Sequence, residues 1–228
     1  MVRKRRIYLV LTVSLIFSFL AAYASIEYLR QFDFNTDNAL SEWGRMILKG
    51  KVEYTLLKQG DNGFVEALSN GTCSALYYRL TFKLKDHPNL TWKWHVVKFP
   101  DKSRAVTDKE KDDYAARVYV IFPFLNFSSS KFMEYIWDES LPVGTVLTSP
   151  EGDNIRLIVA RSGKAEEGQW FEESRNVYED YIAAFGQEPK MSVGAVAIMC
   201  DADSTKSRSE AMFDDIVVGG REILERGM

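Results

Sequence analysis

Short runs of β-branched and aromatic residues recur along most of the chain, and turn-forming residues separate them. Apolar and polar residues alternate within several runs, which is the period of a strand with one buried face. The pattern predicts strands near Phe32–Phe34, Trp43–Leu48, Val52–Lys58, Phe64–Ser69, Ser74–Leu84, Leu90–Phe99, Tyr114–Phe122, Ile155–Arg161, Met191–Cys200 and Met212–Val218. Asp61-Asn62-Gly63 lies between two of them and indicates a hairpin turn.

One helix is predicted, Val177–Phe185, with Gly186 as its C-terminal stop. Many short strands with so little helix predict a mainly β fold, a jelly-roll-like antiparallel β-sandwich. No linker, low-complexity tract or repeat divides residues 27–228, so we expect a single domain there. All five tryptophans fall in this part of the chain, and they fit either a large β core or a sugar-stacking surface.

The first 26 residues have a different pattern. Four cations occupy positions 3–6, and residues 7–26 carry no charge. This is an export signal, and the basic cluster keeps the N-terminus cytoplasmic. The segment 1–26 is either a signal peptide, cut after Ala24 in the small-x-small motif Ala22-Tyr23-Ala24, or an uncut N-terminal hydrophobic helix that anchors the chain. The domain is then periplasmic or tethered to the outer face of the cytoplasmic membrane.

Charge narrows the classes of partner. The whole chain has 29 Lys+Arg and 32 Asp+Glu, so removing the four N-terminal cations leaves 25 against 32, a net charge of −7 for the exported part. Such an acidic domain does not match nucleic acid or anionic lipid.

The two cysteines, Cys73 and Cys200, either pair in the oxidising compartment or stay as two separately buried thiols.

Three predicted strands each place a cation on their second face. These positions hold Lys93 with His95, Arg117 with Tyr119, and Arg156. If the strands are neighbours in one sheet, the five side chains form a concave surface that could bind a ligand. The alternative is a solvated outer sheet face whose long side chains only cover apolar surface.

Two groups of charges suggest further roles. Asp201, Asp203, Asp214 and Asp215 could supply oxygen ligands to a structural Ca²⁺, although the EF-hand spacing is missing and Asx turns are the alternative.

A second group of charges lies inside otherwise apolar blocks. Asp112, Asp113, Arg175 and Asp180, together with Arg117, are expected to form Asp–Arg pairs, one of which would brace the helix against a sheet. An arginine that binds an acidic sugar is the functional alternative. No other metal or cofactor motif is present: the chain lacks a Cys/His cluster and a nucleotide-binding motif.

Catalysis has weaker support. A glycosidase would need two carboxylates about 5–10 Å apart across a cleft. The candidates are Glu134, Asp138, Glu139, Glu172, Glu173 and Asp180, for which surface charge is the simpler interpretation. His87 and His95 are the only histidines, and no Gly-x-Ser-x-Gly motif accompanies them, so a nucleophilic triad is not indicated.

Several blocks of sequence together resemble a known family. They are Trp92-Lys93-Trp94, Asp112-Asp113-Tyr114-Ala115-Ala116-Arg117-Val118-Tyr119-Val120, Tyr135-Ile136-Trp137, Arg175-Asn176-Val177, Asp180-Tyr181, Phe185-Gly186, Ala197-Ile198-Met199-Cys200-Asp201-Ala202-Asp203-Ser204-Thr205 and Asp214-Asp215-Ile216. In this order they resemble the bacterial domain-of-unknown-function family 3047. The resemblance implies an exported jelly-roll-like sandwich without an established activity, so it assigns no catalytic residue. Cys200 stands where the family leads us to expect threonine, which argues against a structural disulfide.

These features predict an exported, non-catalytic binding module at the cell envelope, with a glycan as the expected ligand. A glycan-active hydrolase or lyase with an acidic pair is the first alternative. The second is a scaffold that binds another envelope protein through an exposed strand edge. An uncut N-terminal helix would add the membrane as a partner.

Overall fold

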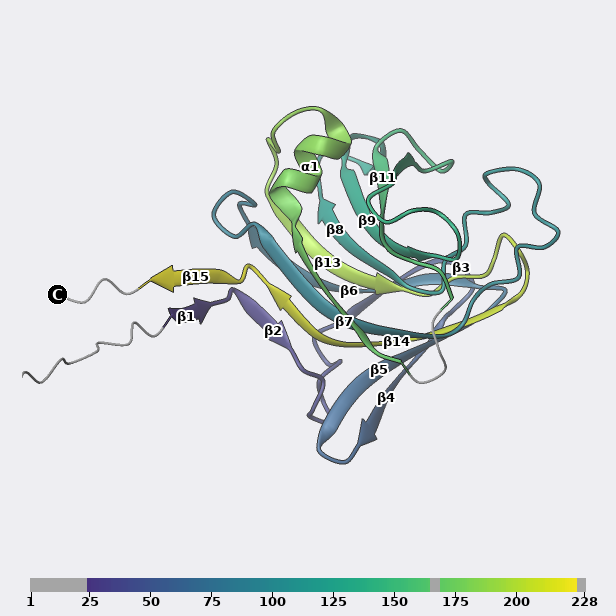
Figure 1. Ribbon diagram of the computed structural model, residues 1–228, viewed down its shortest axis with the longest axis horizontal. Coiled ribbons are helices and arrows are strands. Elements are labelled where there is room, and N and C mark those ends of the chain that lie inside the picture. Colours follow the sequence, from purple (N-terminus) through teal and green to yellow (C-terminus); the bar gives the residue numbers. More distant parts are fainter. Residues whose placement is uncertain (1–23, 165–168, 225–228) are drawn as a thin grey trace, which may run out of the picture.

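The computed structural model describes residues 24–164 and 169–224, and Figure 1 shows a fold made mostly of strands. The larger sheet has seven strands in the order β10 (Val146–Thr148), β11 (Ile155–Ser162), β9 (Lys131–Asp138), β8 (Arg117–Phe122), β13 (Val193–Met199), β6 (Cys73–Phe82) and β3 (Gly44–Lys49). The six-stranded sheet has the order β12 (Phe171–Asn176), β7 (Asn89–Lys98), β14 (Arg208–Val218), β5 (Asn62–Asn70) and β4 (Glu53–Gln59), with β2 (Arg30–Phe32) beside β14.

Four short elements complete the fold. Strands β1 (Ala24–Glu27) and β15 (Arg221–Leu224) pair with each other and extend away from the two large sheets in Figure 1. A single 3-10 turn, η1 (Phe127–Ser129), follows β8, and the helix α1 (Val177–Phe185) follows β12. The mainly β, two-sheet prediction is confirmed for the part of the chain described here. Its strictly antiparallel form is wrong at one place, because β11 runs parallel to β9.

Aromatic side chains fill the space between the two large sheets. Trp92 and Trp94 come from β7, and Tyr135 and Trp137 come from β9 of the opposite sheet. The ring centroids of Trp92 and Tyr135 lie 5.1 Å apart, and those of Trp94 and Trp137 lie 5.7 Å apart. Four of the five tryptophans are buried, so the core, not a sugar-stacking surface, accounts for them. Burying a large aromatic side chain stabilises the fold by about 2 kcal/mol or more.

The ten predicted strands each overlap a strand of the structure, and the helix has the predicted bounds. Asn176 caps its N-terminus by accepting a hydrogen bond from the Glu179 amide, and Gly186 ends it at φ 69°. The predicted turn is displaced by two residues: Asn62 and Gly63 already belong to β5, and Gly60 with Asp61 connects β4 to β5. Gly63 instead permits a close approach, because a Cβ there would lie 2.0 Å from the Phe34 carbonyl oxygen.

Five strands were not predicted, namely β1, β9, β10, β12 and β15. Strand β9 matters most, because it lies in the middle of the larger sheet. Both of its faces are buried, so its sequence Phe-Met-Glu-Tyr-Ile-Trp-Asp shows no apolar–polar alternation. Strand β12 is short and mostly polar, so it resembles a loop in sequence.

Most of the predicted export segment lies outside the described residues, which begin at position 24. Its last three residues, 24–26, belong to strand β1 and not to a helix. Among the described residues, no helix has both the length and the apolar character needed to cross a membrane.

The two cysteines are free and buried. The Cys73 thiol packs with Met199 and Tyr119 on the outer face of the seven-stranded sheet, while Cys200 belongs to the core between the sheets. The alternative of two separately buried thiols therefore describes this structure.

Candidate functional site

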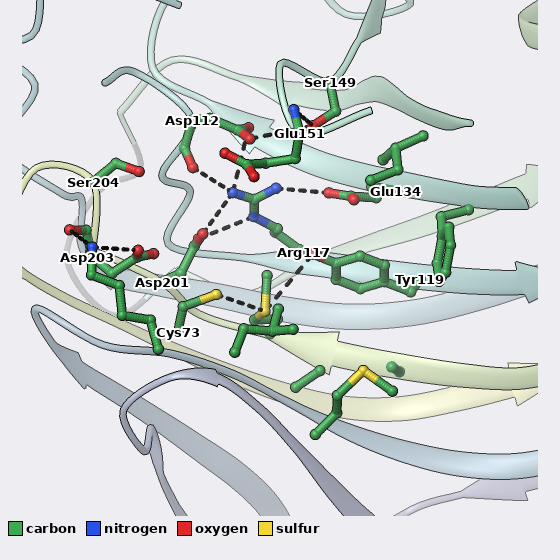
Figure 2. Close-up of a pocket in the computed structure, with 18 of the residues that line it drawn as sticks. Cys73, Asp112, Arg117, Tyr119, Glu134, Ser149, Glu151, Asp201, Asp203 and Ser204 are labelled. Atoms are coloured by element: carbon green, nitrogen blue, oxygen red, sulfur yellow. Dashed lines mark hydrogen bonds and ion pairs between the residues drawn. The ribbon is translucent and has the colours of Figure 1, made fainter. Parts of the chain in front are cut away.

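The outer face of the seven-stranded sheet carries a cavity of about 440 Å³, which we call the cleft (Figure 2). Side chains from six neighbouring strands form its floor, and the loops at one end add charged groups. The floor is largely apolar and consists of Met46, Leu48, Cys73, Ala75, Tyr119, Ile121, Phe132, Ile155, Ala197 and Met199. A ligand in the cleft would therefore meet an apolar surface along the sheet and a polar group at one end.

Strand register explains why these side chains share one face. Arg117 lies opposite Met199 of β13, and Tyr119 lies opposite Ala197 of β13 and Glu134 of β9. Successive side chains of a strand point to opposite faces, so these five residues project away from the core. The intervening residues of β8 and β9 fill the space between the two sheets.

Arg117 is the centre of the polar end (Figure 2). Its Nε donates to Asp201 Oδ1 at 3.0 Å and its Nη2 to Asp201 Oδ2 at 2.6 Å. Its Nη1 donates to Glu134 Oε2 at 2.7 Å, and Nη2 also donates to the backbone oxygen of Asp112 at 2.7 Å. The Asp112 carboxylate lies 3.5 Å from Nη2. One buried guanidinium thus faces three buried carboxylates, Asp112, Glu134 and Asp201.

Burial and the excess of carboxylates over cations shift the pKa values of the carboxyl groups in this cluster. Burial raises the pKa of Asp201 to about 7, with Asp113 adding repulsion and Arg117 opposing the rise. Burial also raises the pKa of Glu134, and the Asp112 charge adds to that effect. Arg117 keeps its charge: burial acts against it, but the carboxylates outweigh burial and raise its pKa. Both shifts favour the protonated form of the buried carboxyl groups, while Arg117 stays charged.

The loop after β13 is fixed beside this cluster. Asp113 accepts hydrogen bonds from the amides of Ser204 and Thr205, at 3.1 and 2.6 Å. The Tyr114 amide donates to Asp201 Oδ1 at 2.9 Å. Because these contacts join the segment before β8 to the segment after β13, the two ends of the polar rim are held together.

Two further contacts complete the polar end of the cleft. Lys49 at the end of β3 forms an ion pair with Asp203 at 3.0 Å, in which the lysine is largely exposed. Cys73 donates to Met199 Sδ at 3.7 Å. Burial raises the pKa of the Cys73 thiol, and Asp201 adds to the rise, so the sulfur remains a neutral part of the floor.

The predicted five-residue binding surface is not assembled. Arg117 and Tyr119 line the cleft, but Lys93 and His95 lie on β7 of the other sheet, where Lys93 pairs with Asp215 at 2.7 Å. Arg156 is on β11 of the same sheet as Arg117 but on its opposite face, and its Nε donates to the Ala184 carbonyl oxygen of α1. The prediction failed because strand adjacency and the inward face of β11 depend on tertiary packing.

The predicted calcium ligands also lie apart. Asp201 and Asp203 follow β13, whereas Asp214 and Asp215 belong to β14 of the other sheet. Asp214 accepts a hydrogen bond from the side-chain amide of Asn62 at 2.9 Å. Among the described residues, Asp214 and Asp215 do not lie close enough to Asp201 and Asp203 to share a metal ion. The described residues thus do not form the four-aspartate site.

The charges predicted to brace the helix are found together. Arg175 precedes α1 and forms an ion pair with Asp180 at 2.6 Å, and Tyr135 of β9 donates to the same carboxylate at 2.7 Å. Asp112 and Asp113 belong instead to the segment before β8, at the cleft.

Glu134 is the cleft residue that sequence reasoning misjudged. Surface charge is the simpler interpretation of its sequence, but Glu134 is 4% exposed and bound to Arg117. A signal for this was available: a single glutamate stands inside an otherwise apolar run, and a buried carboxylate requires a partner.

Several solved structures match the chain over most of its length, with TM-scores below 0.5. The family 30 carbohydrate-binding module of the cellulosomal cellulase Cel9D-Cel44B of Clostridium thermocellum has a TM-score of 0.43 and 8% identity, and covers 82% of this chain and 93% of its own. Endoglucanase Cel12A from Rhodothermus marinus has a TM-score of 0.45 and 9% identity, and the match covers 88% of this chain and 100% of the endoglucanase chain. The mannan-recognising module TmCBM27 has a TM-score of 0.36 and 11% identity, and the match covers 88% of this chain and 99% of the module.

These likenesses are loose, and none of them indicates what this chain binds or whether it is catalytic. Among curated proteins, none matches the chain in sequence. A family model does match, with the description "Protein of unknown function (DUF3047)", and it spans residues 41–217, from just before β3 to the penultimate residue of β14. The chain therefore belongs to the DUF3047 family of proteins of unknown function.

Proposed function

We propose that the protein is an exported, non-catalytic binding module of the cell envelope and that a glycan binds in the cleft. The observation that carries this proposal is the cavity itself, with an apolar floor on the sheet and carboxylates at one end. The CH faces of a sugar ring would pack on the side chains of Tyr119, Met199 and Ile121. Its hydroxyl groups would donate to the carboxylate oxygens at the polar end.

A binding role fits this site better than catalysis does. Glu134 and Asp201 both accept hydrogen bonds from Arg117 and are 4% and 2% exposed. A hydrolase needs two carboxylates that reach the scissile bond, one of which exchanges a proton with it. Carboxylates bound to the same guanidinium in the floor of the sheet are held away from that role.

One observation nevertheless favours a glycan hydrolase as the second candidate. The pKa of Asp201 is raised to about 7 by burial, and the pKa of Glu134 is raised in the same way, next to a cavity. A carboxyl group that keeps its proton near neutral pH is the usual general acid of such enzymes. If the protein is a hydrolase, new reducing ends should appear when it is incubated with a polysaccharide. The absence of new reducing ends across a broad panel of polysaccharides would exclude this candidate.

The export part of the proposal rests on the sequence of residues 1–26, with four cations followed by an uncharged run. Fractionation of cells that produce the full chain, followed by N-terminal sequencing, tests it. A mature N-terminus at Ser25 indicates cleavage, an intact N-terminus in the membrane fraction indicates an anchor, and a cytosolic chain contradicts export.

The binding part is tested with the full chain, purified in mild detergent, on an array of bacterial and plant glycans. Ala75→Trp places a large ring in the floor of the cleft, where Ala75 lies between Met46 and Met199 in register. We expect this variant to lose binding. The matched control is Thr55→Trp, on an exposed position of β4 in the other sheet. Equal binding by both variants would contradict the cleft as the binding site.

A further inference from the structure

Arg117 has little capacity left for a ligand. A guanidinium has five N–H donors, and the contacts with Asp201, Glu134 and the Asp112 backbone use Nε, Nη1 and both donors of Nη2. One N–H of Nη1 remains, so an acidic sugar or another anion would have to displace one of these acceptors to form the two-point contact that arginine makes with a carboxylate. The geometry therefore argues against the acidic ligand that an arginine in the sequence first suggested.

The cleft instead has a surplus of negative charge. Its lining includes five carboxylates and three cations. Lys49 pairs with Asp203 at 3.0 Å and Lys109 pairs with Glu151 at 3.1 Å, and both lysines are largely exposed. Arg117 alone then offsets Asp112, Glu134 and Asp201. The surplus is thus concentrated at the buried polar end of the cavity.

One carboxylate of this cluster has an acceptor without a hydrogen bond. Asp112 is 8% exposed, and among the described residues no group donates a hydrogen bond to its Oδ1. This oxygen lies 3.5 Å from Nη2 of Arg117, and that nitrogen already donates to two other oxygens. Its Oδ2 has a single long contact, 3.4 Å from the Ser149 hydroxyl. Figure 2 shows the carboxylate beside the guanidinium, at the rim that Ser149 and Glu151 form. A buried acceptor without a donor destabilises the structure, so a ligand that supplies the donor would bind with a gain in free energy.

The floor of the cleft requires a ligand to have an apolar face as well. Ala75, Ala197, Met199 and Ile121 cover the floor next to the cluster, and their side chains offer no donor and at most the weak thioether acceptor. A small ligand that satisfies both parts has an apolar face for the floor and a positively charged hydrogen-bond donor for Asp112.

We propose that the ligand is an amino sugar with a free, protonated amine, which binds at Asp112 while the ring packs on the apolar floor. This inference rests on the proposed function as a glycan-binding module. An ammonium group supplies three N–H donors and one positive charge, so it satisfies the Asp112 oxygens and offsets the surplus charge. An N-acetylated sugar of the same shape has no such charge, and a uronic acid adds another negative one.

The test uses titration calorimetry of the full chain with three probes of equal length: a glucosamine tetramer, its N-acetylated counterpart and a galacturonate tetramer. A charge-assisted hydrogen bond leads us to expect that the glucosamine tetramer binds about tenfold or more tightly than the acetylated one, and that galacturonate does not bind. Equal or tighter binding of the acetylated tetramer or of galacturonate would overturn the inference while leaving glycan binding in place. Binding of no glycan, here and on the array, would remove the proposed function itself.

Variants locate the amine in the cleft. Asp112→Asn is expected to weaken binding of the glucosamine tetramer about tenfold and to leave binding of the acetylated tetramer unchanged. The matched control is Asp37→Asn, an exposed carboxylate that pairs with Lys58 away from the cleft. The preference of the wild-type chain between the two tetramers remains a test if Asp112→Asn fails to fold. An unchanged preference in a folded Asp112→Asn variant contradicts the assignment to Asp112.

Discussion

Arg117 and Arg175 form ion pairs of two different kinds in the same molecule. Arg175 is 26% exposed in its side chain and pairs with one aspartate, Asp180, to which Tyr135 also donates. Arg117 is 4% exposed and faces three carboxylates beside a cavity. The Arg175 pair is balanced and links α1 to the sheet, whereas the Arg117 cluster has three carboxylates to one cation, and among the described residues Asp112 Oδ1 accepts no hydrogen bond. A balanced pair braces a fold; an unbalanced one in a cavity also provides a place for a ligand.

The largest difference between the two sites is expected on removal of the arginine. Arg117→Met leaves three buried carboxylates without their cation, and breaking a buried ion pair from one side costs about 3–5 kcal/mol. We expect the free energy of unfolding at pH 7, measured with urea, to fall by about that amount. Arg104→Met, at an exposed position, is the control. A loss no larger than that of the control would contradict the structural role of Arg117.

The balanced pair should matter less. Arg175→Met removes two hydrogen bonds to Asp180 from a site that is partly open to solvent, where the half-buried carboxylate regains water. The expected loss in free energy of unfolding is about 1–2 kcal/mol. The same urea titration measures it. A loss equal to that of Arg117→Met would mean that burial and charge imbalance do not separate the two sites.

Asp214 extends the comparison to a buried carboxylate with no arginine bound to it. Burial raises its pKa from 3.8 to about 6, against the hydrogen bond from Asn62. The folded state thus holds this proton more tightly than the unfolded chain, which favours folding at low pH. That contribution is complete below pH 3.8 and is lost as the pH rises through about 6.

Asparagine at position 214 cannot titrate, so Asp214→Asn should gain stability relative to wild type as the pH rises from about 4 to about 6. The expected gain is about 2 kcal/mol over this range, followed by a constant difference at higher pH. Unfolding curves of both proteins at a series of pH values measure it. A difference that stays constant over this range, or that changes with the opposite sign, would contradict the raised pKa.

The smallest expected effect is that of a reductant. Cys73 faces the cleft beside the Arg117 cluster, and Cys200 faces the core, where its thiol lies 3.0 Å from the Ser209 hydroxyl. With both thiols free, the melting temperature should be the same with and without reductant. Two thiols should react with a thiol reagent once the chain is unfolded. A lower melting temperature in reductant would indicate a disulfide.

Local sequence accounts for much of the fold. Strands with one buried face, such as β7, alternate apolar and polar residues and were predicted near their observed bounds. The helix was predicted to the residue, because Asn176 and Gly186 are strong local signals for its two ends. Strand β9 was missed because burial on both faces removes alternation, and Glu134 was misjudged with it.

The site divides in the same way. The residue types that form the polar end, including Asp112, Arg117 and Asp201, stand out in the sequence as charges within apolar blocks, which already implies that they are paired. Which charge meets which is a matter of strand order: β8 lies between β9 and β13, so Arg117 reaches Glu134 on one side and Asp201 on the other. Sequence alone determined ten of the strands, the helix and the need for partners, because these depend on neighbours along the chain. Only the tertiary structure decided the partners and the cleft, because strands distant in sequence become neighbours through core packing.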